Sequence, residues 1–191
     1  MASTLPQVEG LQYVANYLDQ STHDSLLASV DLAPWLWSVD HGVQIYGYRY
    51  QHSTGSVFRI GELPSWSIEL AARLHCDGFL PSVPDQMVVN DYKPGSGIFA
   101  HVDQAPFGDR VASVSLGSTC VMQFSKVGVE REEEILLEPG SLLLLSGEAR
   151  WSWRHGIPAR IVDSWQRQER PRSRRVSLTF RIIPAATADL A

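Results

Sequence analysis

The second half of the chain is a series of short apolar segments separated by turn residues. The segments are rich in β-branched, aromatic and aliphatic residues, which is typical of strands. Eight of them follow one another: QMVVNDY (86–92), IFAHVD (98–103), VASVSLGS (111–118), CVMQFSKV (120–127), EEILLEP (133–139), SLLLLSG (141–147), EARWSWRHGI (148–157) and RRVSLTFRII (174–183). Eight short strands within about 100 residues predict a jelly roll, the double-stranded β-helix of cupin-like barrels.

The first 84 residues have a mixed pattern. Two segments resemble strands, GLQYVANYL (10–18) and VQIYGYRYQ (43–51). Two others have helical spacing, DQSTHDSLLASV (19–30) and PSWSIELAARLHCDG (64–78). Ser21 or Thr22 is available as N-cap of the first helix. We expect residues 1–84 to buttress one sheet with helices and to form a lid over the mouth of the barrel, and residues 85–191 to form the jelly-roll core. The predicted fold is α+β, mainly β, in one structural domain.

The composition is that of an ordinary globular protein. The 191 residues are 44% hydrophobic and 19% charged, and no apolar run approaches the roughly 20 residues that a transmembrane helix needs. The N-terminus MASTLPQVEG lacks a basic-then-apolar signal pattern, so we expect a soluble, cytoplasmic protein. The sequence does not indicate an oligomeric state, and we take a monomer as the expectation. Cys76 and Cys120 lie far apart, and we expect both to be buried and free.

The net charge of −5 is unevenly distributed. Between Arg154 and Arg181, eight arginines stand against two acidic residues, a local charge of +6 that leaves −11 for the remaining chain. Within this stretch, the loop IPARIVDSWQRQERPRS (157–173) combines arginines with Trp165. Such a loop can hold single-stranded nucleic acid through phosphate contacts and stacking. A solvated surface loop balanced by acidic neighbours explains the pattern equally well.

The segment NDYKPGSGIFAHVD (90–103) contains two potential metal ligands. His101 and Asp103 are two residues apart, so a strand would direct both side chains to one face. One imidazole and one carboxylate are two of the three ligands of the 2-His-1-carboxylate site that holds non-haem Fe(II). The other histidine of the β-rich region is His155, in WSWRHGIP, and it is the candidate third ligand. Each motif alone is weak evidence, and their combination within a predicted jelly roll carries the prediction.

The last predicted strand contains two arginines on the same face. Arg175 and Arg181, in RVSLTFR, are six residues apart, whereas Val176, Leu178 and Phe180 point to the other face. If the arginine face is interior, it needs anionic partners. A dicarboxylic 2-oxo acid is one such partner, because a guanidinium matches a carboxylate bidentately, and Asp103 is another. If the arginines face solvent, no ligand is needed.

Taken in order, these motifs closely resemble the AlkB family of Fe(II)/2-oxoglutarate dioxygenases. The resemblance covers residues 86–183 and rests on NDYKPGSGIFAHVD, RVASVSLGSTCVMQF, PGSLLLLSGEARWSWRHGI and RVSLTFR. The residue pattern of the first two segments is most similar to the branch that contains the dioxygenase domain of animal tRNA wobble-uridine hydroxylases.

The resemblance implies roles for individual residues. It implies that His101, Asp103 and His155 bind iron, that Arg175 pairs with the distal carboxylate of 2-oxoglutarate, and that O2 is the oxidant. It also implies that Asn90 and Tyr92 hydrogen-bond the co-substrate, and that Arg181 orients Asp103 and the target.

The family oxidises alkyl groups on nucleobases, and a hydroxylated N-methyl group is lost as formaldehyde. By resemblance, YGYRY (46–50) is a lid strand with Tyr48 and Tyr50 as base contacts, and Trp35, Trp37 and His41 are stacking candidates. Ordinary strand packing explains each of these aromatic residues as well.

One position departs from the bacterial repair enzymes of the family. The residue two positions after the iron aspartate is acidic there and reads the exocyclic amine of the base, whereas it is Ala105 here. Three hypotheses follow: a dealkylase of DNA or RNA bases in nucleic-acid repair; a 2-oxoglutarate-dependent hydroxylase of a tRNA base, a protein side chain or a small molecule; and a non-catalytic jelly-roll binding module. We favour the first.

Overall fold

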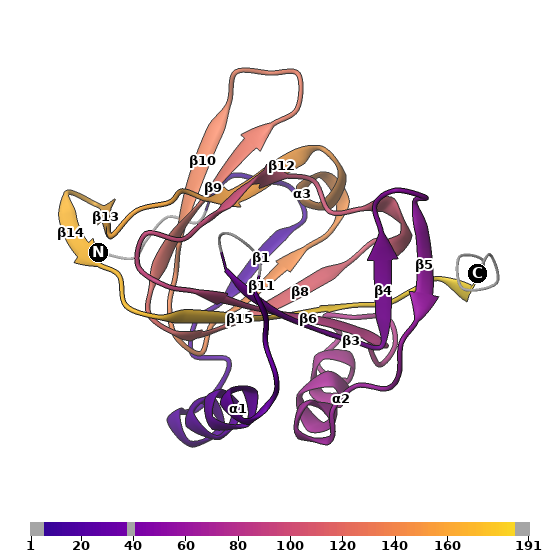
Figure 1. The fold of residues 1–191 in the computed structure, drawn as a ribbon. Coiled ribbons are helices and arrows are strands. Elements are labelled where there is room, and N and C mark those ends of the chain that lie inside the picture. Colours follow the sequence, from indigo (N-terminus) through magenta and orange to yellow (C-terminus); the bar gives the residue numbers. More distant parts are fainter. Residues whose placement is uncertain (1–5, 38–40, 186–191) are drawn as a thin grey trace.

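Two antiparallel β-sheets pack face to face in the computed structural model, which describes residues 6–37 and 41–185 (Figure 1). The larger sheet has seven strands, in the order β1 (Leu11–Val14), β11 (Leu142–Leu145), β8 (Val111–Gly117), β15 (Arg175–Arg181), β6 (Gln86–Tyr92), β3 (Gly42–Tyr46) and β2 (Leu36–Trp37). The smaller sheet has four, in the order β10 (Glu132–Leu137), β9 (Cys120–Lys126), β12 (Trp153–Ile157) and β7 (Ile98–His101). The predicted jelly roll is confirmed.

The helices α1 (Gln20–Leu32) and α2 (Ile68–Cys76) lie against the outer face of the larger sheet (Figure 1). The short helix η1 (Ser65–Ser67) precedes α2. Asp19 caps α1, because its side chain accepts a hydrogen bond from the Thr22 N–H at 2.7 Å. The prediction of Ser21 or Thr22 as the cap is therefore wrong by two or three residues.

The predicted strand at 43–51 is divided at Gly47. This glycine has a φ of +75°, and a Cβ there would lie 1.8 Å from the carbonyl oxygen of Asp85, so only glycine fits. Before it, β3 pairs with β6 in the larger sheet. After it, β4 (Tyr48–Gln51) and β5 (Ser56–Arg59) form a separate two-stranded hairpin, here called the lid hairpin. Thus the first 84 residues supply strands to the larger sheet as well as helices and the lid hairpin.

Two segments of the second half differ from the sequence prediction. Residues 148–157 are not one strand, because α3 (Gly147–Trp151) precedes β12. The α3 turn is fixed by tertiary contacts, including the bond from the Ala149 N–H to the Glu9 carbonyl. The arginine-rich loop at 157–173 contains a hairpin, β13 (Val162–Trp165) and β14 (Gln168–Pro171), at the opposite end of the barrel from the lid hairpin (Figure 1).

The core has a layer on each side of the larger sheet. One apolar cluster fills the space between this sheet and the helices, and includes Leu74, Val114 and Phe180. A second cluster lies between the two sheets and includes Phe124 and Trp153. All seven residues of β15 are buried, so this central strand has no solvent face.

Other sequence expectations have mixed outcomes. Both cysteines are free, as predicted, but Cys76 is exposed and only Cys120 is buried. None of the helices in the described residues has the length and hydrophobicity of a transmembrane helix. The cytoplasmic location and the monomeric state stay predictions.

A buried ion pair attaches the β13–β14 hairpin to the barrel. Arg172 donates two bonds of 2.6 Å to the Asp163 carboxylate, and its Nη1 also donates to the Pro158 carbonyl. The Asp163 carboxylate in turn accepts from the Val121 N–H at 3.0 Å. Both side chains are at most 5% exposed, so neither charge has water as an alternative partner.

We predict that Arg172→Ala lowers the free energy of unfolding by about 3–5 kcal/mol, because it leaves the buried Asp163 carboxylate unpaired. Urea denaturation measures this change. The exposed Arg170 on the same hairpin is the control, and Arg170→Ala should change stability by no more than about 0.5 kcal/mol. Equal effects of the two substitutions would contradict this account.

Candidate metal and co-substrate site

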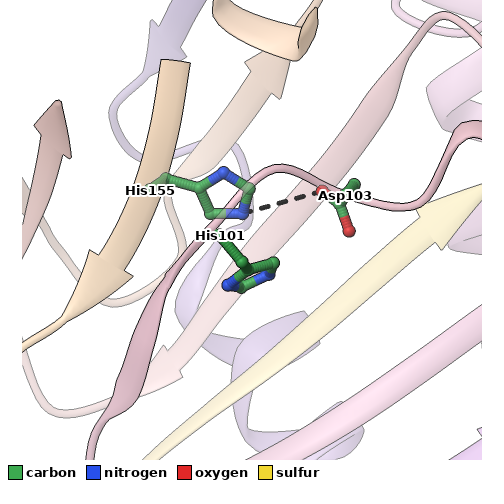
Figure 2. Close-up of side chains that lie close together, drawn as sticks. All are labelled: His101, Asp103 and His155. Atoms are coloured by element: carbon green, nitrogen blue, oxygen red, sulfur yellow. Dashed lines mark ion pairs between the residues drawn. The ribbon is translucent and has the colours of Figure 1, made fainter. Parts of the chain in front are cut away.

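The structure brings His101, Asp103 and His155 together between the two sheets (Figure 2). His101 ends β7 and lies directly opposite His155 on β12. Gly156 permits this close pairing, since a Cβ there would lie 2.9 Å from the backbone of Ala100. Asp103 lies beyond the end of β7, not on the strand as predicted, and its orientation therefore depends on the turn that follows.

One nitrogen of each imidazole and one Asp103 oxygen are mutually within 4.8 Å, a spacing that one metal ion can bridge. The His155 Nε2 lies 3.6 Å from the Asp103 Oδ2 (Figure 2). The His101 Nδ1 lies 2.8 Å from the Phe99 carbonyl oxygen and donates to it, which leaves Nε2 as the basic nitrogen. Burial lowers the pKa of His155 to about 4, despite the opposing effect of Asp103, so its ring is neutral near pH 7.

The two oxygens of Asp103 have different environments. Oδ1 accepts a 2.6 Å bond from the Arg181 Nη2, whereas Oδ2 is buried without a hydrogen-bond partner. Burial by itself raises the pKa of this carboxyl, but the Arg181 guanidinium and the two imidazoles outweigh it and hold the pKa well below its usual value. One carboxylate oxygen and two imidazole nitrogens fit the ligand set of Fe(II).

Arg175 is a buried guanidinium with vacant donors. It is 2% exposed, and its Nη2 donates to the Ser115 hydroxyl at 2.9 Å. Its Nε and Nη1 are buried without a partner. Burying such donors costs free energy unless an anion satisfies them, and the distal carboxylate of 2-oxoglutarate has the required charge and planar shape.

Arg175 and the triad line one interior cavity of about 60 Å³. Asn90 and Tyr92, the other predicted co-substrate contacts, line the same cavity. Burial raises the pKa of Tyr92 to about 12, so its hydroxyl stays protonated and can donate a hydrogen bond. The candidate metal ligands and the candidate carboxylate-binding donors therefore line the same cavity.

Arg150 is a site residue that sequence reasoning missed. It is 1% exposed, and it donates to the backbone carbonyls of Asp103, Gln104 and Gly108 at 2.7–3.0 Å. It thereby fixes the turn that carries the metal carboxylate. The available signal was an arginine five residues before His155, next to Trp151, but the α3 turn that buries it is decided by tertiary contacts.

The predicted base contacts do not all lie together. Tyr48 and Tyr50 of the lid hairpin pack on a small cluster that contains Phe107. His41 stacks on Tyr92 with ring centroids 5.4 Å apart. Trp35 packs instead against the core on the helix side.

Trp37 forms β2, but its side chain lies outside the described part of the structure. Ala105 lies in the short helix η2 (Ala105–Phe107) and is exposed.

The arginine-rich segment is less basic at the surface than its sequence indicates. Arg172 is neutralised by Asp163, Arg174 by Asp31 and Asp91, and Arg175 and Arg181 face the interior cavity. The remaining four are at least partly exposed: Arg154, Arg160, Arg167 and Arg170. Half of the eight arginines are thus paired with aspartates at the surface or in the interior, or face the cavity.

A family model described as the 2OG-Fe(II) oxygenase superfamily matches residues 18–181. The Alkylated DNA repair protein ALKBH8 homolog of Arabidopsis thaliana is 32% identical, over 92% of this chain and 59% of that protein. An uncharacterised protein of Acanthamoeba polyphaga mimivirus is 30% identical, over 92% of this chain and 86% of its own length.

The tRNA (carboxymethyluridine(34)-5-O)-methyltransferase ALKBH8 of Mus musculus is 33% identical, over 84% of this chain but 26% of that protein. The solved structure of OsALKBH1 has the same fold, with a TM-score of 0.71 at 17% identity over 91% of this chain and 96% of that one.

We predict that His101→Ala abolishes metal-dependent turnover of 2-oxoglutarate, because it removes one of three ligands. Succinate release with added Fe(II) measures turnover, and binding of Mn(II) measures loading separately. Thermal unfolding checks that the variant is folded. Full activity in metal-stripped His101→Ala protein would contradict the assignment of these three residues as metal ligands.

We predict that Arg175→Ala raises the KM for 2-oxoglutarate about 10- to 100-fold, since hydrogen bonds to a charged group contribute about 1.5–3 kcal/mol. Arg175→Lys is the matched control, because it keeps the charge but lacks the planar fork. Its KM for 2-oxoglutarate should lie between those of the parent protein and Arg175→Ala. An unchanged KM in Arg175→Ala would place the co-substrate carboxylate elsewhere.

Proposed function

Since the chain belongs to the 2OG-Fe(II) oxygenase superfamily and is AlkB-like, we propose that this dioxygenase oxidatively dealkylates nucleobases in DNA or RNA. The observation that carries the proposal is one cavity that joins a His-Asp-His triad to a buried arginine with vacant donors. A binding module without chemistry has no need of either feature, and both cost folding free energy.

The chemistry divides between the bound groups and the chain. Iron and 2-oxoglutarate together supply the oxidising power to insert oxygen from O2 into a C–H bond. The side chains hold these groups and exclude water: His101, Asp103 and His155 would bind the metal, and Arg175, Asn90 and Tyr92 would bind the co-substrate. An N-alkyl group hydroxylated on its first carbon breaks down, and a methyl group leaves as formaldehyde.

Three observations support a nucleic-acid substrate. Named relatives are a DNA repair homologue and a tRNA methyltransferase. The lid hairpin carries Tyr48 and Tyr50 beside the metal-site turn, where an extruded base would be covered. The exposed arginines of residues 154–170 offer phosphate contacts. Because the chain spans only 26% of the mouse tRNA methyltransferase, that protein's whole activity does not transfer to this chain.

A second candidate function is hydroxylation of a tRNA base, a protein side chain or a small molecule. Ala105 favours it, because no carboxylate stands at that position to accept a hydrogen bond from an exocyclic amine. The acidic net charge of −5 also disfavours tight, nonspecific binding of nucleic acid.

We expect the protein to release succinate and formaldehyde together from at least one alkylated oligonucleotide. The panel contains methylated and etheno-adducted DNA and RNA and bulk tRNA, with Fe(II) and 2-oxoglutarate added. Substrate mass replaces formaldehyde as the readout for etheno lesions and hydroxylated bases.

His101→Ala is the inactive control for this panel. Binding to single-stranded oligonucleotides should weaken steeply with salt, since phosphate contacts release counterions. Succinate release without change in any nucleic acid, and no binding at low salt, would contradict the dealkylase and favour the second candidate.

A further inference from the structure

The lid hairpin rests on the turn that carries the metal carboxylate. Its buried contact is a small cluster of Val57, Phe107 and Ile183, with Tyr48 and Tyr50 packed against it. Phe107 ends η2, four residues after Asp103, and its ring centroid lies 5.8 Å from that of Tyr50. The lid hairpin therefore packs directly against the turn that carries Asp103.

Phe107 also contacts the arginine that holds Asp103. The Arg181 guanidinium lies over the Phe107 ring, 4.6 Å from its centroid, while its Nη2 donates to the Asp103 Oδ1 at 2.6 Å. A cation over an aromatic face is attracted by the ring quadrupole, and more strongly where water is excluded. Arg181 is 9% exposed, so the ring replaces water on one face of the guanidinium.

A second route connects the lid to the same arginine. The Arg181 Nη1 donates to the Gln86 Oε1 at 3.3 Å, and the Gln86 Nε2 donates to the Tyr48 carbonyl of the lid hairpin at 3.4 Å. Gln86 is buried at the start of β6, opposite Arg181 on β15. Phe107 and Gln86 thus approach Arg181 from different elements, and both lead to the lid hairpin.

We propose that Phe107 and Gln86 are positioning residues, which couple the seating of the lid hairpin to the orientation of the metal carboxylate through Arg181. With both contacts in place, Arg181 occupies Oδ1 of Asp103 and leaves only Oδ2 for a metal. Without them, the guanidinium loses two of its restraints, and the carboxylate can rotate. The metal centre is then fully ordered only when the lid is seated, which suppresses 2-oxoglutarate turnover in the absence of substrate.

The test uses the full chain loaded with Co(II), whose visible absorption reports the geometry of its ligands, and needs no identified substrate. Phe107→Leu removes the ring but keeps an apolar side chain, and Gln86→Met removes the hydrogen bonds at similar length. Both should alter the Co(II) spectrum and weaken Co(II) binding about tenfold, the lower range for residues that orient metal ligands. Both should also lower Fe(II)-dependent succinate release, because the Asp103 carboxylate is then unrestrained even when the lid is seated.

Two further variants separate positioning from packing. Leu74→Ala weakens the core on the helix side of the larger sheet, away from the lid hairpin and Arg181, so it should lower the Tm but leave the Co(II) spectrum and affinity unchanged. Phe107→Tyr keeps the ring face and should retain the parental spectrum. The inference is overturned if Phe107→Leu and Leu74→Ala behave alike in the metal readouts. Failure of the parent protein to bind Co(II) would instead overturn the metal assignment itself.

Discussion

The burial of β15 on both faces is the constraint on which the site depends. Its even-numbered positions Val176, Leu178 and Phe180 pack toward the helices, and its odd-numbered positions face the cavity. The strand consequently brings two guanidinium groups into the interior, where an isolated charge is very costly. Asp103 of the chain neutralises one of them. The other, Arg175, retains two donors without partners, which an anionic ligand would satisfy.

Around this strand, the metal carboxylate is held by contacts from several elements. Arg150 of α3 binds the backbone of the turn at 103–108, and Arg181 binds the side chain of Asp103. The lid hairpin reaches the same arginine through Phe107 and Gln86. Asp103 lies beyond the end of its strand, and these contacts take the place of the strand pairing that positions His101 on β7 and His155 on β12.

The distribution of charge has a structural as well as a functional component. Two of the arginines between residues 154 and 181 neutralise buried or partly buried aspartates, and two serve the cavity. Counting charges along the sequence therefore overestimates the basic surface available to phosphates. Of the four arginines that remain at least partly exposed, Arg167 and Arg170 lie in the β13–β14 hairpin, at the far end of the barrel from the lid hairpin, whereas Arg154 lies on β12.

The sequence by itself determined the jelly roll, most of its strands and the residues that the cavity brings together. The alternation of apolar and polar residues and the order of the motifs are properties of the sequence itself, so they predict the strands directly. β6 begins and ends where predicted, and β8 and β9 end within one residue of prediction. Tertiary structure alone decided what depends on distant partners. The strand divides at Gly47 because the Asp85 carbonyl lies against it, and Arg150 is buried because it binds the turn at 103–108. Arg172 is paired because the fold brings Asp163 beside it. No local pattern encodes these contacts, because each requires a partner that only the fold brings within reach.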